Sequence, residues 1–293
     1  MHRDRDAAAP DAARGRAREF RTGARATSVG LITGDVANPF YARIARGAEA
    51  TLRAHGGQLV SASSDEDEAR ERALVEDMLD RRLGGLLIVG AADDYGWLAA
   101  EQQHGVPVVF LDRAPSSLAA DCVVIDNTSG VTEAVEGLLA AGHRRLALVG
   151  DLRRLPTHRQ RCEAFLAATA GRLGVRTVVR SDSHDSDEAA RAVAGLLAEP
   201  DPPTAFVTTN NRITVGALRA LAGLAAPPAL VEFDDVDLAD VLGVTVIAHD
   251  PDEMGRRGAA VLLERLAGDT TPFRTQVLPT RLVRRGSGER PPR

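Results

Sequence analysis

The chain has 293 residues, of which 44% are hydrophobic and only 3% are aromatic. This length suits two lobes better than one core, and the few aromatic residues favour Ala, Val and Leu packed between helices and parallel strands. The formal net charge of −5 excludes a basic surface spread over the whole molecule, so any nucleic-acid contact must come from a local element.

From residue 28 onward, apolar strands alternate with amphipathic helices. In the first block we expect strands at 29–32, 58–62, 86–89, 106–111 and 122–125, with helices near 41–54, 67–82 and 95–104. In the second block we expect helices at 131–141, 159–170, 187–197 and 213–221, with strands at 146–149, 176–179, 205–207 and 229–233. Such alternation predicts right-handed crossovers and parallel sheets, so we assign the α/β class with two doubly wound lobes.

The two ends of the chain differ from this pattern. After His249, the run PDEMGRRGAAVLLERLAGD predicts an amphipathic helix, and a final strand is expected at 276–283. Residues 287–293 are expected to be a disordered tail. Residues 1–27 are rich in Arg, Ala and Asp and show no recurring apolar face.

Composition also bears on location and cofactors. Cys122 and Cys162 lie in no CxxC or Cys/His cluster, which argues against a disulfide framework or a zinc site. No apolar run approaches the length of a membrane span, and the N-terminus lacks the apolar segment of a secretory signal. We therefore expect a cytoplasmic location, no membrane partner and no cofactor.

Motifs for catalysis are missing from the sequence. Its Ser, His and Asp residues never stand in a nucleophile-elbow or metal-ligand spacing. The first predicted strand is followed by neither GxGxxG nor GxxxxGK[ST]. The sequence thus predicts a binding protein and not an enzyme.

Candidate binding residues follow the ends of predicted strands, where ligands bind in open α/β sheets. Five of them belong to the first block: Asp35, Phe40, Tyr41, Asp112 and Arg113. The aromatic pair could stack on the face of a sugar or base, and the Asp–Arg pair could bind a polyol or a carboxylate. The alternatives are a turn residue for Asp35, helix packing for Phe40 and a surface ion pair for Asp112 with Arg113.

The segment 204–235 has the same feature twice. Asn210 and Asn211 follow one strand, and Asp234 and Asp235 follow the next. Since Asn is also a preferred N-cap, a capping role is the alternative for the two asparagines. Glu232 lies within the predicted strand at 229–233, where a buried carboxylate would be costly unless paired.

Several segments in this order resemble the LacI/GalR family of bacterial transcription regulators. They are DVANPFYARIARGAEATLRAHG, RRLGGLLIVG with GVPVVFLDR, VVIDNTSGVTEAVEGLLAAGHRRLALVGD, THRQRCEAF, TAFVTTNN with VEFDD, MGRRGAAVLLERLAGD and LPTRLVRRGS. The resemblance covers about residues 17–286 and implies a type I periplasmic-binding-protein-like core. It also implies three crossings between a first lobe of residues 28–125 with 251–275 and a second lobe of 126–250 with 276–286.

The resemblance assigns ligand roles to residues of the second lobe. Arg161 aligns with the family arginine that reaches the effector, Asn210 keeps the family amide and Asp234 matches the ligand aspartate. His249 stands where the family often has Gln; a structural role is its alternative. Asn211 replaces the usual Asp and Glu232 a usual Gly, so both positions depart from the family.

The same resemblance implies a contact with DNA near the start of the chain. AREFRTG looks like the end of a hinge helix, with Phe20 at the residue that enters the minor groove and Arg18 and Arg21 beside phosphates. A three-helix headpiece needs more than about 30 residues, and only 16 precede Ala17. Either the start lies upstream, which we favour, or direct DNA reading has been lost and residues 1–27 are disordered.

We therefore expect a homodimeric, ligand-responsive regulator of the LacI/GalR type whose lobes close on a sugar or nucleoside. The helices near 44–52 and 74–79 are candidates for the dimer face. Operator DNA is a partner only if a headpiece precedes this chain. The main alternative is a free-standing sugar-binding protein of the periplasmic type without DNA binding; an enzyme on an α/β scaffold is the second.

Overall fold

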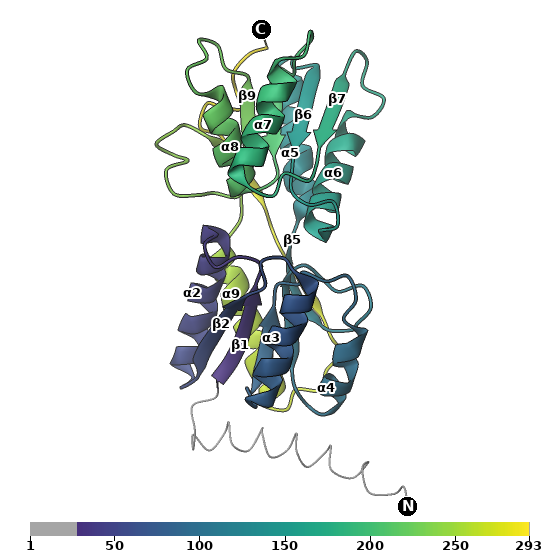
Figure 1. The fold of residues 1–293 in the computed structure, drawn as a ribbon, viewed down its shortest axis with the longest axis vertical. Helices are drawn as coiled ribbons and strands as arrows, with labels where there is room; N and C mark the ends of the chain where they lie inside the picture. Colours follow the sequence, from purple (N-terminus) through teal and green to yellow (C-terminus); the bar gives the residue numbers. More distant parts are fainter. Residues whose placement is uncertain (1–27, 293) are drawn as a thin grey trace, which may run out of the picture. The chain divides into compact units, whose positions relative to one another are not determined.

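The computed structural model describes residues 28–292. The expectations for residues 1–27, including Arg18, Phe20 and Arg21, lie outside the described residues. The described chain forms two compact lobes, the first of residues 28–124 with 250–278 and the second of residues 125–249 with 279–292. Each lobe contains one six-stranded, mostly parallel sheet with helices packed against it (Figure 1). The α/β class and the type I fold are confirmed.

The first lobe carries the first sheet. In sheet order its strands are β11 (Thr275–Leu278), β5 (Asp121–Ile125), β4 (Val108–Asp112), β3 (Gly85–Ile88), β1 (Ser28–Thr33) and β2 (Gln58–Ser63). Its helices are α2 (Pro39–Ala54), α3 (Glu68–Asp80), the 3-10 turn η1 (Gly96–Leu98), α4 (Ala99–Gln103) and α9 (Pro251–Leu266). The central strands β3 and β4 are buried along their whole length, as expected for apolar runs covered on both faces.

The second lobe repeats this plan. In sheet order its strands are β12 (Arg281–Val283), β10 (Thr245–Ala248), β9 (Ala229–Phe233), β8 (Ala205–Thr208), β6 (Arg145–Val149) and β7 (Arg176–Arg180). Its helices are α5 (Asn127–Ala140), α6 (Pro156–Thr169), α7 (Ser186–Leu197) and α8 (Asn211–Leu221). Only β12 at the edge is antiparallel to its neighbour, and β10 was not anticipated from the sequence.

The single strand expected at 276–283 is two strands in two different sheets. β11 pairs at the edge of the first sheet beside β5, whereas β12 pairs with β10 in the second. Pro279 lies between them and has no N–H to donate to a ladder, so the strand cannot continue through it. Residues 276–278 therefore belong to the first lobe, not the second.

The expectation of a disordered tail is wrong for residues 287–292. Ser287 is buried, its hydroxyl donates to Leu230 O at 2.6 Å, and it accepts from Thr245 N at 2.8 Å. The carbonyl of Arg290 lies 2.8 Å from Nε2 of His143. These bonds tie the tail to β9, β10 and the end of α5, which explains its order.

Helices α2 and α9 cross in close contact within the first lobe. A Cβ on Gly47 would lie 2.0 Å from Asp252 O, and a Cβ on Gly255 would lie 2.0 Å from Ile44 O, so both positions require glycine. The contact buries Ile44, Ala48 and Leu52 of α2 completely. The apolar side chains near 44–52 are therefore not available for a dimer face, because α9 already covers them.

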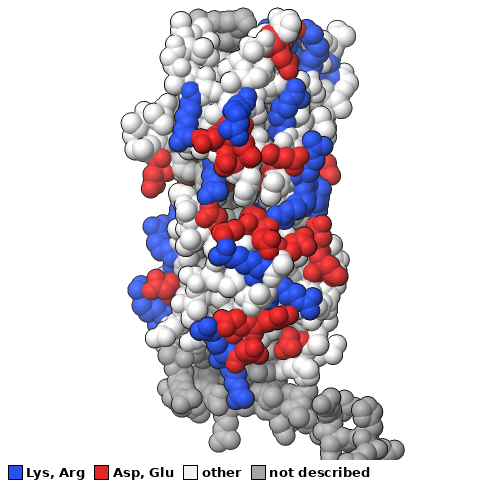
Figure 2. Space-filling model, viewed as in Figure 1, with Lys and Arg blue, Asp and Glu red and all other residues white. Residues whose placement is uncertain are grey.

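The surface of the described residues has no large region of a single charge on the face shown in Figure 2, in keeping with the small net charge of the chain. On the face drawn in Figure 2, acidic and basic side chains are interspersed over both lobes. None of the helices within residues 28–292 is long and apolar enough to cross a membrane.

Candidate ligand-binding half-sites

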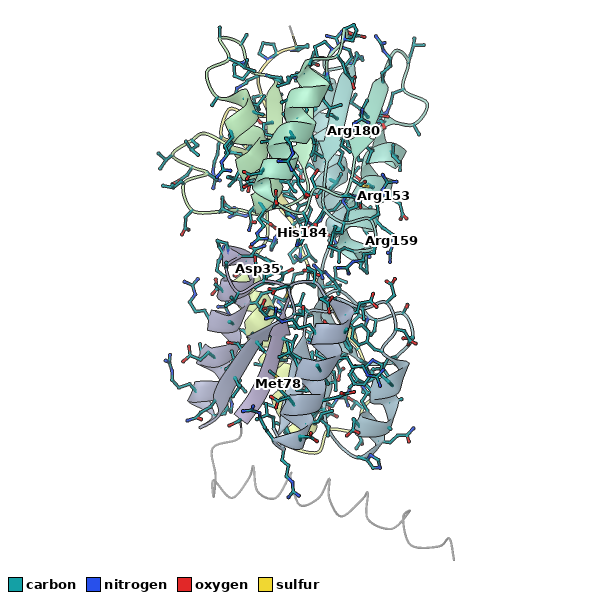
Figure 3. The ribbon with its side chains drawn as sticks, viewed as in Figure 1. Asp35, Met78, Arg153, Arg159, Arg180 and His184 are labelled. Atoms are coloured by element: carbon teal, nitrogen blue, oxygen red, sulfur yellow. The ribbon has the colours of Figure 1, made fainter. Side chains whose placement is uncertain are left out.

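The loops after β1, β2, β3 and β4 meet at the carboxyl end of the first sheet. Figure 3 shows Asp35, which follows β1, at this end of the first lobe. We call the following residues the first half-site: Asp35, Phe40, Tyr41, Glu66, Asp112 and Arg113.

A buried ion pair lies at the centre of the first half-site. Arg113 donates from Nη1 to Glu66 Oε2 at 2.6 Å and from Nη2 to Glu66 Oε1 at 3.0 Å. Both side chains are only 6% exposed. Arg113 also donates to Gly90 O at 2.8 Å and to the Tyr41 hydroxyl at 3.0 Å, and that hydroxyl donates to Glu66 Oε1 at 3.1 Å. The alternative of a surface ion pair is wrong for Arg113, whose main partner is a buried carboxylate.

Of the remaining residues of this half-site, Asp112 lies against the pair. Asp112 has a φ of 65°, a strained conformation for a residue other than glycine, and its Oδ2 lies 3.6 Å from Arg113 Nε. Asp35 Oδ1 accepts from Ala37 N at 2.8 Å, which makes it a turn residue. The rings of Phe40 and Tyr41 lie 5.1 Å apart at 59°. The structure thus brings Tyr41, Asp112 and Arg113 together.

Glu66 was missed by the sequence analysis. It stands just after β2, at the same end of the sheet as the chosen residues, and this position was the available signal. Its φ of 58° follows that of Asp65 at 53°. Two successive left-handed residues without glycine are uncommon, so the turn that aims Glu66 at Arg113 could not be read from residue types.

A second buried network supports the loop after β3. Glu71 of α3 accepts from the Tyr95 hydroxyl at 2.5 Å and from Ala91 N at 2.7 Å. The Tyr95 hydroxyl also accepts from Ala92 N at 3.0 Å. Burial raises the pKa of Glu71 and that of Tyr95 above their ordinary values. The network fixes this loop and with it the Gly90 carbonyl that accepts from Arg113.

The second half-site lies at the carboxyl ends of the second sheet. We give this name to the following residues: Asn127, Arg161, Thr209, Asn210, Asn211, Phe233, Asp234 and His249. In Figure 3, Arg153, Arg159 and His184 lie toward this end of the second lobe, and Arg180 lies farther along it.

Arg161 of α6 is buried. Its Nε donates to Asn127 Oδ1 at 2.8 Å, and its Nη1 donates to Thr209 O. The guanidinium carbon lies 3.5 Å from the ring centroid of Phe233, a cation–π contact. The His249 ring also lies near that ring, with 5.8 Å between centroids. One aromatic ring therefore joins two of the expected ligand residues.

Asp234 connects this cluster to α8. Its Oδ1 accepts from His249 Nε2 at 2.8 Å and its Oδ2 from Asn211 N at 3.3 Å. Nε2 must carry the ring proton in this contact, because a carboxylate only accepts. The next residue, Asp235, instead pairs with both terminal nitrogens of Arg285 at 2.7 and 2.9 Å.

Asn210 is the N-cap of α8. Its Oδ1 accepts from Ile213 N at 2.9 Å, and its Nδ2 donates to Asp151 Oδ2 at 2.8 Å. Asp151 Oδ1 also lies 3.0 Å from His184 Nδ1. The capping alternative is thus observed for Asn210, while its contact with a ligand stays a prediction.

Glu232 lies in the core directly behind the second half-site. It is 1% exposed in β9, in register with Thr208 of β8 and Val246 of β10. Among the described residues, neither carboxyl oxygen makes a hydrogen bond of ordinary length and angle. Burial, with smaller contributions from Asp234 and Asp235, raises the pKa of Glu232 to about 9. The carboxyl group is therefore protonated at neutral pH, which makes its burial tolerable.

The geometry of both half-sites is that of a polar binding site with aromatic contacts. It offers carboxylate acceptors and guanidinium and amide donors, and these suit a hydroxyl-rich ligand. Within residues 28–292, no group of His, Cys, Asp and Glu side chains is arranged to hold a metal ion.

The sequence matches known proteins along most of its length. The model of the family described as "Periplasmic binding proteins and sugar binding domain of LacI family" matches residues 26–242. The chain is 30% identical over 270 residues to the HTH-type transcriptional regulator PtxS of Pseudomonas plecoglossicida, covering 90% of this chain and 78% of the relative. This relative is a transcriptional regulator, not an enzyme.

Solved structures show the same fold. A putative ribose operon repressor from Burkholderia thailandensis superposes with a TM-score of 0.79 at 28% identity, over 89% of this chain and all of that one. The Cra transcriptional dual regulator from Pseudomonas putida, in complex with fructose 1-phosphate, superposes with a TM-score of 0.82 at 24% identity, over 88% of this chain and 98% of that one.

Proposed function

The chain belongs to the LacI family of transcription regulators, as its effector-binding domain, and we propose that its two half-sites together bind a sugar or nucleoside effector. The relative PtxS is an HTH-type regulator, which favours this role over that of a free-standing sugar-binding protein.

The observation that carries the proposal is the cluster around Phe233. Arg161 and His249 lie against this ring, and Asp234 accepts from His249. A guanidinium and a carboxylate held beside one buried ring provide donors and acceptors within one small region, as saccharide recognition requires.

The names of the structural neighbours support the sugar class. One is called a ribose operon repressor and another was solved with fructose 1-phosphate. The sequence predicts ten ligand contacts, of which five belong to the first half-site and five to the second. We propose nine of them as direct contacts, namely Asp35, Phe40, Tyr41, Asp112, Arg161, Asn210, Asn211, Asp234 and His249. Arg113 we propose as internal support of the first half-site, together with Glu66.

The proposed mechanism is closure of the two lobes on the effector. A ligand that contacts both half-sites binds the closed state more tightly and so shifts the population toward it. In a homodimer, this shift would alter the spacing of the two first lobes and thereby the affinity for operator DNA. In this mechanism, DNA would be contacted by a part of the regulator outside residues 28–292.

A thermal-shift screen with sugars and nucleosides tests the proposal. A ligand at about 100 times its Kd should stabilise the folded protein by about 2.7 kcal/mol. Arg161→Ala and Asp234→Ala should each weaken binding by about 10- to 100-fold, as expected for hydrogen bonds to charged groups. Arg180→Ala is the matched control, because Arg180 lies in the same lobe in a partly exposed ion pair with Glu199. A hit that both site variants retain unchanged would refute the site.

A further inference from the structure

We propose that Glu66 sets the charge preference of the first half-site, so that this half selects uncharged hydroxyl groups and excludes anions. The inference rests on the proposed function, because it assumes that the first half-site faces the effector. It concerns a residue that the sequence analysis did not select.

The guanidinium of Arg113 uses its terminal donors within the first lobe. Each terminal nitrogen of a guanidinium carries two N–H groups. Nη1 donates to Glu66 Oε2 and Gly90 O, and Nη2 donates to the Tyr41 hydroxyl and Glu66 Oε1. All four terminal N–H groups are therefore used within the lobe. The fifth N–H is on Nε, which lies 3.6 Å from Asp112 Oδ2, so an anion there would meet a carboxylate.

The charges of the first half-site also disfavour an anion. Glu66 cancels the charge of Arg113 through a two-pronged contact, in which both side chains are 6% exposed. Asp35 and Asp112 then add two carboxylates at the same end of the sheet. An effector anion placed here would meet net negative charge, whereas a hydroxyl group can donate to these carboxylates.

The backbone of the first half-site is shaped around the Glu66 carboxylate. A Cβ on Gly34 would lie 1.9 Å from Glu66 Oε1, so only glycine leaves room for the carboxylate at this place. Asp65 and Glu66 both adopt left-handed φ values, 53° and 58°, which cost conformational energy. The ion pair with Arg113 offsets that cost, and the position is thus built for a carboxylate.

The test uses inorganic phosphate as the anionic probe. Glu66→Gln keeps the size of the side chain but leaves the charge of Arg113 uncompensated. At constant ionic strength, with phosphate exchanged for chloride, the variant should bind phosphate at least tenfold more tightly than the wild type, as measured by ³¹P line broadening. The double variant Glu66→Gln/Arg113→Gln should lose this gain. Equal phosphate affinity of Glu66→Gln and the wild type would overturn the proposal.

A second measurement needs only the wild-type protein and so does not depend on the folding of a variant. Crystals soaked in sodium phosphate should show no phosphate within hydrogen-bond distance of Arg113, and a phosphate bound there would also overturn the proposal. Neither arm requires a known effector. If no sugar or nucleoside binds, the proposed function fails, while the phosphate comparison still decides the role of Glu66.

Discussion

Each half-site rests on a buried glutamate, and the two lobes accommodate it in opposite ways. In the first lobe, Glu66 forms a two-pronged ion pair with Arg113. In the second lobe, Glu232 makes no such pair, and burial raises its pKa to about 9 so that it is protonated at neutral pH. The comparison teaches that a buried acid is tolerated either by a matched cation or by a retained proton, and the two solutions respond differently to mutation and to pH.

The largest expected effect is the loss of the cation in the first lobe. Arg113→Met should destabilise the protein by about 3–5 kcal/mol, because it leaves the Glu66 carboxylate buried and unpaired. Urea unfolding followed by circular dichroism measures this. The double variant Glu66→Gln/Arg113→Met should recover most of the loss. If Arg113→Met were as stable as the wild type, the pair would not support the lobe.

The second prediction concerns pH and the second lobe. Between about pH 4.5 and 9, the folded state holds a proton on Glu232 that the unfolded state has lost, so the contribution of Glu232 to stability falls by about 1.4 kcal/mol per pH unit as pH rises. Glu232→Gln removes this slope. Relative to the wild type, the variant should gain on the order of 2–4 kcal/mol between pH 5 and pH 8.

The control for this pH series is Glu199→Gln. Glu199 lies in the same lobe with its side chain 40% exposed, and its substitution should leave the pH dependence of unfolding unchanged. A Glu232→Gln variant that follows the wild-type pH curve would show that Glu232 is ionised in the folded protein and paired after all.

The third prediction is a smaller loss of stability, caused by crowding the Glu66–Arg113 ion pair. Gly34→Ala should destabilise by about 1–3 kcal/mol, because the added methyl group displaces the Glu66 carboxylate. Gly195→Ala in α7 is the matched control: a Cβ there meets nothing within 4 Å. It should stabilise the helix by about 0.5–1 kcal/mol. Thermal unfolding measures the melting temperature of both variants. The prediction is contradicted if both melting temperatures shift in the same direction from that of the wild type.

The smallest effect concerns the cap of α8 in the second half-site. Asn210→Ala should cost about 1 kcal/mol, because it removes the acceptor for Ile213 N. Asn210→Ser keeps a capping oxygen and should cost less. Equal losses for both variants would mean that the bond to Asp151, and not the cap, determines the stability at this position.

The sequence predicted the fold well because its main signal is local. Alternating apolar strands and helices with short connections leave few topologies, and right-handed crossovers leave fewer. The ends of the predicted strands then placed Asp112 and Arg113 at the carboxyl end of one sheet, and Asn210 and Asp234 at the carboxyl end of the other. These are consequences of strand direction, which residue patterns carry.

Features that depend on contacts distant in the sequence were not predicted. The helical periodicity of α2 marks Ile44 and Leu52 as an apolar face, but it cannot tell whether α9 or a second subunit covers that face. The pairing of Glu66 with Arg113 joins residues 47 positions apart through a turn of unusual backbone conformation. The residues before Pro279 pair with the first sheet as β11, and those after it pair with the second sheet as β12. Which sheet has an edge strand free for pairing cannot be read from this segment alone.

The central claim is that the two half-sites bind one uncharged, hydroxyl-rich effector, with Arg161 and Asp234 as direct contacts and Arg113 as internal support. A crystal structure of the protein with a sugar that stabilises it tests this most directly. The account predicts sugar hydroxyls within hydrogen-bond distance of Arg161 and Asp234, and Arg113 still paired with Glu66. A sugar bound away from these residues, or a Glu66–Arg113 pair opened to reach it, would contradict the account.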